Sequence, residues 1–315
     1  MILTVTPNPA IDVTYAVDGL APGASLRVDA PAVRAGGKGV NVARVLTQVG
    51  TDALAVVTAG GETGRELAAE LATSGLAHRV VPVAGATRRS VALVDRAAGD
   101  TTILNERGTE LAAAELDALR AAVVELLGAE GPGRVSCLVV SGSLPPGAPA
   151  GLDAGLVTAA HDAGVPAVVD AVGPPLLAAC AVGVDLVKPN REELVATTGT
   201  ADPVAGARAL LEAGARRVVV TLGPDGMIVV DADRPGDVLR ARLPRALRGN
   251  PTGAGDAAVA AAAVSLADRT PGQPDLAALL RRAVAWSAAA VLAPLAGELD
   301  PAYRALERDV VLTRS

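Results

Sequence analysis

Residues Asn250–Asp256 read NPTGAGD, and they run directly into the apolar segment Ala257–Val264, AAVAAAAV. The two glycines let backbone N–H groups converge where a helix begins, and the positive end of that helix suits a phosphate oxygen. A carboxylate one residue later, Asp256, can accept a proton from an alcohol that lies against the same phosphate. The segment predicts a helix start built for phosphoryl transfer. Taken alone, a Gly-x-Gly-Asp match is equally typical of an ordinary helix start with an acidic first turn.

Two upstream segments and the start of the chain decide between these interpretations. Residues 35–43 read AGGKGVNVA, a glycine-rich turn that leads into an apolar pattern with helical spacing. Residues 187–194 read VKPNREEL, where a strand-like stretch ends in a proline turn and Asn190 has the position of a helix N-cap. The opening strand ends in TPNPAID at 6–12.

Together these segments resemble the ribokinase-like (PfkB) family of sugar kinases, and the resemblance spans nearly the whole chain. The opening MILTVTPNPAIDVTY, the segment AGGKGVNVARVL and the turn SGSLPPG are most similar to the branch of 1-phosphofructokinases and tagatose-6-phosphate kinases. The resemblance implies transfer of the γ-phosphoryl group of ATP to a hydroxyl of a phosphorylated ketohexose, fructose 1-phosphate or tagatose 6-phosphate, giving a ketohexose bisphosphate. It also implies ATP and Mg²⁺ as cofactors.

The composition fits a globular enzyme. The chain has 315 residues, of which 50% are hydrophobic and 1% aromatic, and its formal net charge is −6. An acidic chain with almost no aromatic side chains has little with which to bind nucleic acid, so no nucleic-acid partner is expected. The length fits a single kinase domain over residues 1–315.

The sequence lacks the motifs that mark several other classes of protein. Cys137 and Cys180 lie in apolar stretches without Cys-x-x-Cys spacing, so we expect buried thiols in a reducing, cytoplasmic environment. The start of the chain does not read as a signal peptide, and no apolar run has the length of a membrane span, so no membrane partner is expected. No Walker motif occurs, which excludes a P-loop kinase.

The order of apolar patterns predicts an α/β fold. Short β-branched runs alternate with helical patterns, which is typical of a doubly wound, mainly parallel sheet with helices on both faces. We expect core strands at 2–6, 53–58, 135–141, 166–170, 184–188 and 216–222, and helices near 38–49, 63–74, 112–127, 150–163 and 203–213. Residues 11–34 and 88–107 break this pattern and are interpreted as antiparallel strands. The resemblance implies that they form a small β lid over the sugar site, and an open lid edge suggests a homodimer through the lid.

The resemblance implies an acceptor site built from the lid and the first glycine-rich turn. The Asp12 carboxylate would hold sugar hydroxyls. Arg88, in the pair Thr87-Arg88, is the best candidate for the phosphate already on the substrate, and Arg89 and Arg107 are weaker candidates that could be solvated surface residues. The predicted substrate-binding residues are Asp12, Arg27, Gly36, Gly37, Lys38, Asn41, Arg88 and Asn105.

The site for the phosphoryl donor, ATP, is expected at residues 187–194 and at the turn 221–226. Asn190 and Glu193 share one helix face, and by resemblance they would organise Mg²⁺ on the ATP phosphates through water, although an Asn-x-x-Glu capping box explains the same spacing. Ser287 lies in what we take as the last helix, and the resemblance implies a position near adenine, where some relatives have an asparagine. The predicted nucleotide-binding residues are Lys188, Asn190, Glu193, Thr221, Gly223, Gly226 and Ser287.

The predicted reaction uses Asp256 as the base and the amides of Gly253, Ala254 and Gly255 as the anion hole. Two alternatives stay open at this point. One is a kinase of an unphosphorylated sugar or nucleoside, which would not need Arg88. The other is a non-catalytic sugar-binding regulator on the same fold, which an intact Asp256 disfavours.

Overall fold

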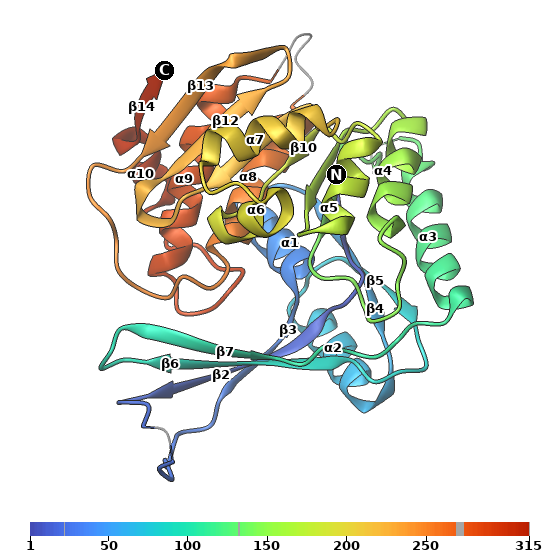
Figure 1. Ribbon diagram of the computed structural model, residues 1–315. Coiled ribbons are helices and arrows are strands. Elements are labelled where there is room, and N and C mark those ends of the chain that lie inside the picture. Colours follow the sequence, from blue (N-terminus) through green and yellow to red (C-terminus); the bar gives the residue numbers. More distant parts are fainter. Residues whose placement is uncertain (22, 132, 269–273, 315) are drawn as a thin grey trace.

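The structure, a computed structural model, describes residues 1–21, 23–131, 133–268 and 274–314 (Figure 1). Residue 22, inside the first predicted lid segment, lies outside the described residues, as do residues 132, 269–273 and 315 of the predicted domain. A large sheet with helices on both faces forms the body, and a small sheet lies across one end of it, at the bottom of Figure 1.

The large sheet contains all of the predicted core strands. Its strand order is β14-β13-β12-β11-β10-β9-β8-β1-β4-β5, and the strands from β11 to β5 pair in parallel. β10 has only two residues, because Pro189 has no N–H for a further ladder bond. The predicted strands are β1 (Ile2–Thr6), β4 (Ala53–Ala59), β8 (Cys137–Ser141), β9 (Ala167–Asp170), β10 (Leu186–Val187) and β11 (Arg217–Thr221).

The helices cover both faces of this sheet, which explains why its strands are apolar without alternation. In β1, Ile2 packs into a core cluster with the first, eighth and ninth helices, whereas Leu3 and Val5 pack into a second cluster with the third and fourth. Cys137 and Cys180 are buried as predicted. The helices are α1 (Lys38–Gln48), α2 (Gly61–Thr73), α3 (Ala113–Leu127), α4 (Leu152–Asp162), α5 (Pro174–Ala181), α6 (Arg191–Thr198), α7 (Pro203–Glu212), α8 (Ala254–Ala267), α9 (Leu276–Leu292) and α10 (Tyr303–Asp309).

The small sheet is the predicted lid. Its order is β3-β2-β6-β7, formed by β2 (Ala10–Val17), β3 (Ala32–Gly36), β6 (Arg88–Asp95) and β7 (Asp100–Asn105). The pairs β2–β3 and β6–β7 are antiparallel, as predicted, and a parallel pairing of β2 with β6 joins them. In this register Asp12 pairs with Arg34 and with Ser90, so these three side chains share one face of the lid.

Four strands of the large sheet were not predicted. They are β5 (His78–Pro82), β12 (Met227–Asp231), β13 (Arg234–Arg242) and β14 (Val311–Arg314), and they lie at the two edges. β13 is exposed at five of its nine positions, so its sequence RPGDVLRAR does not show the apolar pattern of a core strand. Within the described residues, no helix is both long enough and apolar enough to cross a membrane.

Candidate active site

The predicted helix start at NPTGAGD forms one wall of the site. Gly253 is the N-cap of α8 and has a φ of 86°, a left-handed conformation that favours glycine. A Cβ atom at this position would lie 3.0 Å from the Cα atom of Ala296, so glycine also permits a close approach of the following loop. The amide of Ala254 donates to the carbonyl of Pro251 at 3.2 Å. One of the three predicted anion-hole amides therefore already has an acceptor.

Asp256 lies in the first turn of α8 and is 5% exposed. Its Oδ2 atom accepts a hydrogen bond from Nδ2 of Asn41 at 2.8 Å. Burial raises the pKa of Asp256 to about 7, and the ammonium group of Lys38 partly opposes this rise. Although Asp256 lies at the positive end of a helix, which favours its ionised form, burial brings its pKa close to neutral pH.

Asp12, in β2, faces the first glycine-rich turn. A Cβ atom at Gly36 would lie 2.0 Å from Oδ2 of Asp12, so only glycine allows this carboxylate to lie against the backbone. Gly37 is the N-cap of α1 with a φ of 104°. Burial raises the pKa of Asp12 to about 6, while Arg88, Arg44 and Arg34 lower it. The structure thus brings the predicted acceptor residues Asp12, Gly36, Gly37, Asn41 and Arg88 together.

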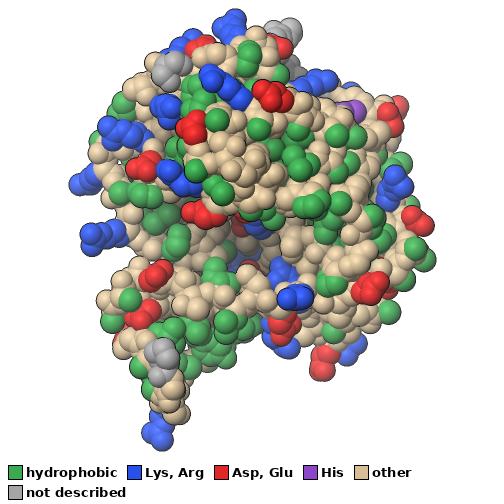
Figure 2. Space-filling model, in the orientation of Figure 1, with side chains coloured by type: hydrophobic (Ala, Val, Ile, Leu, Met, Phe, Trp, Pro, Cys, Tyr) green, Lys and Arg blue, Asp and Glu red, His purple; other side chains and the backbone are tan. Residues whose placement is uncertain are grey.

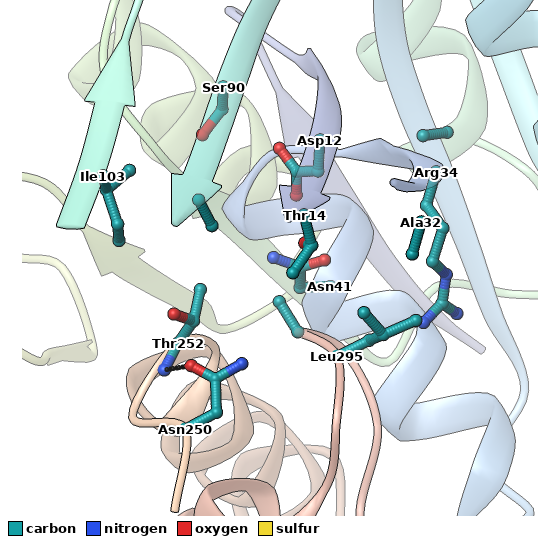
Figure 3. Close-up of a pocket in the computed structure, with 13 residues that line it drawn as sticks. Asp12, Thr14, Ala32, Arg34, Asn41, Ser90, Ile103, Asn250, Thr252 and Leu295 are labelled. Carbon is teal, nitrogen blue, oxygen red and sulfur yellow. Dashed lines mark hydrogen bonds between the residues drawn. The ribbon is translucent and has the colours of Figure 1, made fainter. Parts of the chain in front are cut away.

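A pocket lies between the lid, α1 and the residues Asn250 and Thr252 that precede α8, where Figure 2 shows the surface hollowed. Asp12, Thr14 and Ser90 enter it from the lid, and Asn250 and Thr252 enter from the opposite side (Figure 3). The buried Oγ1 atom of Thr252 has no hydrogen-bond partner. Polar groups on two sides of one cavity suit a ligand that carries several hydroxyl groups.

None of the predicted basic residues lines this pocket. Arg88 lies at the start of β6, where its guanidinium donates to the carbonyl oxygens of Asn8 and Glu106, both at 3.2 Å. Arg89 is exposed and lies 3.5 Å from Glu66, on the opposite face of the lid. Arg27 is exposed in the loop between β2 and β3, which projects from the lid at the bottom of Figure 1. Arg107 is also exposed.

Asn105 is the last residue of β7 and is exposed. It pairs in register with Ser90, which lines the pocket, so it lies on the pocket face of the lid without lining the pocket itself.

The predicted donor residues meet at the start of α6. Asn190 Oδ1 accepts from the amide of Glu193 at 2.7 Å, and Glu193 Oε2 accepts from the amide of Asn190 at 2.9 Å. The capping box is therefore present. The remaining carboxylate oxygen, Oε1 of Glu193, lies 3.3 Å from Nζ of Lys38. Lys38 thus contacts the donor side, although it was predicted as a substrate residue.

The rest of the predicted nucleotide site lies at the end of β11. Thr221 forms an isolated bridge with Asn190, and Gly223 begins a short 3₁₀ turn. Gly226 has a φ of 90°, and a Cβ atom there would lie 2.0 Å from the carbonyl oxygen of Ala241. Ser287 lies in α9, which α10 follows, so the expectation of a last helix was wrong. Its Oγ atom donates to the carbonyl of Ala254 at 2.6 Å.

Sequence reasoning missed several residues of the site. Arg34 lines the pocket and pairs with Glu298 at 2.7 Å. Asp170 ends β9 and contacts both Lys38 and Lys188. A carboxylate at the carboxyl end of a predicted parallel strand was a usable signal for Asp170. Arg34 could be recognised only from the lid register. The other pocket-lining residues that were not predicted are Thr14, Ala32, Ala35, Ser90, Ala92, Ile103, Asn250, Thr252, Leu295 and Ala296.

A doubly wound sheet, a glycine-rich helix start with a buried carboxylate and a small sheet across that end are the features of ribokinase-like sugar kinases. The chain belongs to the pfkB family of carbohydrate kinases, whose sequence profile matches residues 6–302.

Individual relatives cover most of the chain. A 1-phosphofructokinase of Xanthomonas campestris is 38% identical over 84% of both chains, and one of Rhodobacter capsulatus is 36% identical over 100% of this chain and 96% of its own. Phosphofructokinase-2 of Escherichia coli in complex with fructose-6-phosphate is 32% identical over 98% of both chains, with a TM-score of 0.83. Its tetrameric inhibited form superposes with a TM-score of 0.84, at the same identity and coverage.

Proposed function

We propose that this chain transfers the γ-phosphoryl group of ATP to a hydroxyl of a phosphorylated ketohexose and so forms a ketohexose bisphosphate. One observation carries the proposal: the buried carboxylate of Asp256, held by Asn41, stands at the start of α8 beside a polar pocket. The 1-phosphofructokinase relatives support the substrate class. Residues 1–315 act as one kinase domain, with the lid strands closing over the acceptor.

The acceptor side uses the residues gathered around Asp12. A sugar hydroxyl that is buried without a partner costs about 1–3 kcal/mol, so the Asp12 carboxylate, the Asn41 amide and the backbone of Gly36 and Gly37 would hold the hydroxyls. Arg88 shares the lid face of Asp12, because Ala10 pairs with Arg88 as Asp12 pairs with Ser90. Its guanidinium group is suited to the phosphate that the substrate already carries.

The transfer itself needs a base and charge stabilisation. Asp256 takes the hydroxyl proton as the new O–P bond forms in line and the bond to the leaving ADP oxygen breaks. The amides at Gly253 and Gly255, the start of α8 and the nearby lysines meet the charge on the transferred group.

The donor side combines Lys188, Thr221, Gly223 and Gly226 with the start of α6. Asn190 Oδ1 and Glu193 Oε2 are used in the capping box, whereas Oε1 of Glu193 is outside it and contacts only Lys38 among the described partners. A carboxylate oxygen suits a hydrated Mg²⁺, so Glu193 would hold the ion through water. Bound Mg²⁺ would neutralise charge on the ATP phosphates. Ser287 supports the backbone at Ala254 and need not contact adenine.

Fructose 1-phosphate and tagatose 6-phosphate are the first candidates for the acceptor. Fructose 6-phosphate is a further candidate, because the Escherichia coli relative was solved with it. A coupled assay of ADP release over free sugars, nucleosides and these three sugar phosphates, with the product identified by mass, tests the proposal. Bisphosphate formation supports it, whereas turnover only with unphosphorylated acceptors, or with none, contradicts it.

A further inference from the structure

The two lysines of this chain lie in the same place. Of 28 basic residues, only Lys38 and Lys188 are lysines, and all others are arginines. Lys38 begins α1, directly after the glycine turn of the acceptor side, and Lys188 follows β10 on the donor side. They are 150 positions apart in the sequence. Both ammonium groups nevertheless contact one carboxylate, that of Asp170.

Asp170 binds one lysine with each of its carboxylate oxygens. Its Oδ2 atom lies 3.3 Å from Nζ of Lys38 and accepts from Oγ of Ser141 at 3.3 Å. Its Oδ1 atom lies 3.4 Å from Nζ of Lys188. The side chain of Asp170 is 1% exposed and that of Lys188 is 3% exposed, whereas that of Lys38 is 39% exposed. Asp170 and Lys188 thus form a buried pair, and Lys38 extends from it toward solvent.

The cluster of Asp170, Lys38 and Lys188 lies beside the proposed site of phosphoryl transfer. A Cβ atom at Gly255 would lie 3.5 Å from Nζ of Lys188, so this ammonium group lies against the first turn of α8. Lys38 also contacts Glu193 at 3.3 Å. An ammonium group is a compact charge with three donors that can exchange partners, whereas a guanidinium is a rigid planar fork. The ammonium group of a lysine at each of these positions can therefore contact a carboxylate and also a phosphoryl oxygen that moves during the transfer.

We propose that Asp170 is a positioning residue of the phosphoryl transfer, which holds Lys38 and Lys188 beside Asp256 and the start of α8, where the transferred group would lie. The inference rests on the proposed kinase function. Burial disfavours the charge on Asp170, but the two ammonium groups outweigh it and lower the pKa of this carboxyl below its usual range. Asp170 remains an anion, and removal of its charge would remove the ion pair with Lys188 and leave Lys38 with Glu193 alone.

Spectroscopy without substrate tests the positioning directly. In protein labelled with ¹³Cε-lysine, the chain gives two lysine side-chain signals, and Lys38→Met identifies them by removing one. Asp170→Asn, which keeps the shape of the side chain, should move both signals. Asp185→Asn is the matched control, because Asp185 is also buried and paired, with His161 and Arg216, at the other end of β10. It should move neither. An unmoved Lys38 signal in Asp170→Asn overturns the proposal.

Kinetics tests whether the positioning serves the reaction. Asp170→Asn should lower kcat by about 10²-fold, the effect of a small misplacement of reacting groups, with a smaller change in KM. The charged groups that face Asp256 are Lys38, Asp170 and Lys188. Loss of the negative Asp170 should therefore shift the acid limb of kcat to lower pH, and loss of the positive Lys38 should shift it to higher pH.

The outcomes separate the two proposals. If the acid limb of kcat shifts to lower pH in Asp170→Asn and to higher pH in Lys38→Met, electrostatic positioning is supported. If the acid limb keeps the wild-type pH in both variants, electrostatic positioning is overturned. If circular dichroism shows that Asp170→Asn does not fold, the pH dependence of kcat is tested with Lys38→Met alone, in which the acid limb should shift to higher pH. If the wild type phosphorylates no ketohexose phosphate, the proposed function fails, while the lysine spectra still decide whether Asp170 holds the lysines.

Discussion

Burial of single carboxylates sets the chemistry at the scale of residues. Asp256 and Asp12 both lose solvent, and in both cases burial raises the pKa, to about 7 and about 6. A base whose pKa is close to the working pH both accepts a proton readily and is ionised in a useful fraction of molecules. The nearby Lys38 and Asn41 oppose this rise in the pKa of Asp256.

The first prediction concerns Asp256. The reaction needs its ionised form, so kcat should rise with pH through about 7 and level off above that value. Asp256→Asn should keep the fold and lower kcat by roughly 10²–10⁴, the usual contribution of a positioned base. Steady-state rates across pH, with circular dichroism as the folding control, check both points. More than a tenth of the wild-type kcat in the variant would exclude Asp256 as the base.

At the scale of elements, glycine turns position these residues, because they let the backbone lie very close to neighbouring groups. The strand-to-helix turn at Gly36 and Gly37 places the Asp12 carboxylate against the backbone of Gly36, where an added Cβ atom would lie 2.0 Å from its Oδ2 atom. The glycine at position 253 likewise lets the start of α8 lie close to the loop at Ala296, because a Cβ atom there would lie 3.0 Å from the Cα atom of Ala296.

The second prediction tests the turn at Gly36. Gly36→Ala places a methyl group on the Asp12 carboxylate, so it should lower kcat/KM for the acceptor by about 10²-fold through misplacement of Asp12. Gly128→Ala is the matched control, because Gly128 has a φ of −79° and its added Cβ would meet nothing closer than 3.6 Å. Equal kcat/KM values in the two variants would mean that Asp12 does not hold the acceptor.

A buried carboxylate in α4 gives the third prediction. Burial raises the pKa of Asp153 to about 7, and its Oδ1 atom has no hydrogen-bond partner. Because the folded state binds this proton more tightly than the unfolded chain, its contribution to stability is present below about pH 4 and is lost as pH rises to about 7. The loss is on the order of 1.4 kcal/mol per pH unit within this window.

Urea unfolding at several pH values measures that contribution. The free energy of unfolding of Asp153→Asn, relative to the wild type, should increase from about pH 4 to about pH 7. The slope is the readout, because the new amide changes the absolute stability at every pH. A constant difference across this range would show that Asp153 ionises freely in the folded protein.

At the scale of the whole molecule, the lid bears on assembly. Val33 and Leu104 are 42% and 57% exposed, and the register places both on the face opposite Asp12. Figure 2 shows hydrophobic side chains gathered on the lid. Exposed apolar side chains on a small sheet with open edges are a surface that a second subunit can cover.

The fourth prediction is therefore a homodimer through the lid. Light scattering at micromolar concentration should give about twice the chain mass of 31.2 kDa. Leu104→Asp should return the mass toward that of one chain, while Val311→Asp, an exposed apolar position on β14 far along the large sheet, should not. A wild-type mass near 31.2 kDa would contradict the prediction.

Sequence alone predicted most of the body, because the six core strands are continuous apolar runs that no helix pattern matches. It also predicted the helix starts at Gly253 and Asn190, where a glycine and a cap residue have a local physical reason, whereas the role of Asp12 came from the family resemblance. It missed β13, whose arginines hide the strand pattern, and Arg34 and Asp170, whose partners Glu298, Lys38 and Lys188 are distant in the sequence. Such pairings depend on the register of strands, which local patterns do not determine.

The most direct test of the central claim compares acceptors in the wild type and in Arg88→Ala. A phosphorylated ketohexose carries about −1.5 to −2 extra charge, which Arg88 meets with charge-assisted hydrogen bonds. The wild type should prefer the sugar phosphate to the free ketose by orders of magnitude in kcat/KM. Arg88→Ala should lower kcat/KM for the sugar phosphate by about ten- to a hundredfold, about 1.5–3 kcal/mol, and leave that for the free ketose nearly unchanged. A wild type that prefers the free sugar or a nucleoside would contradict the account.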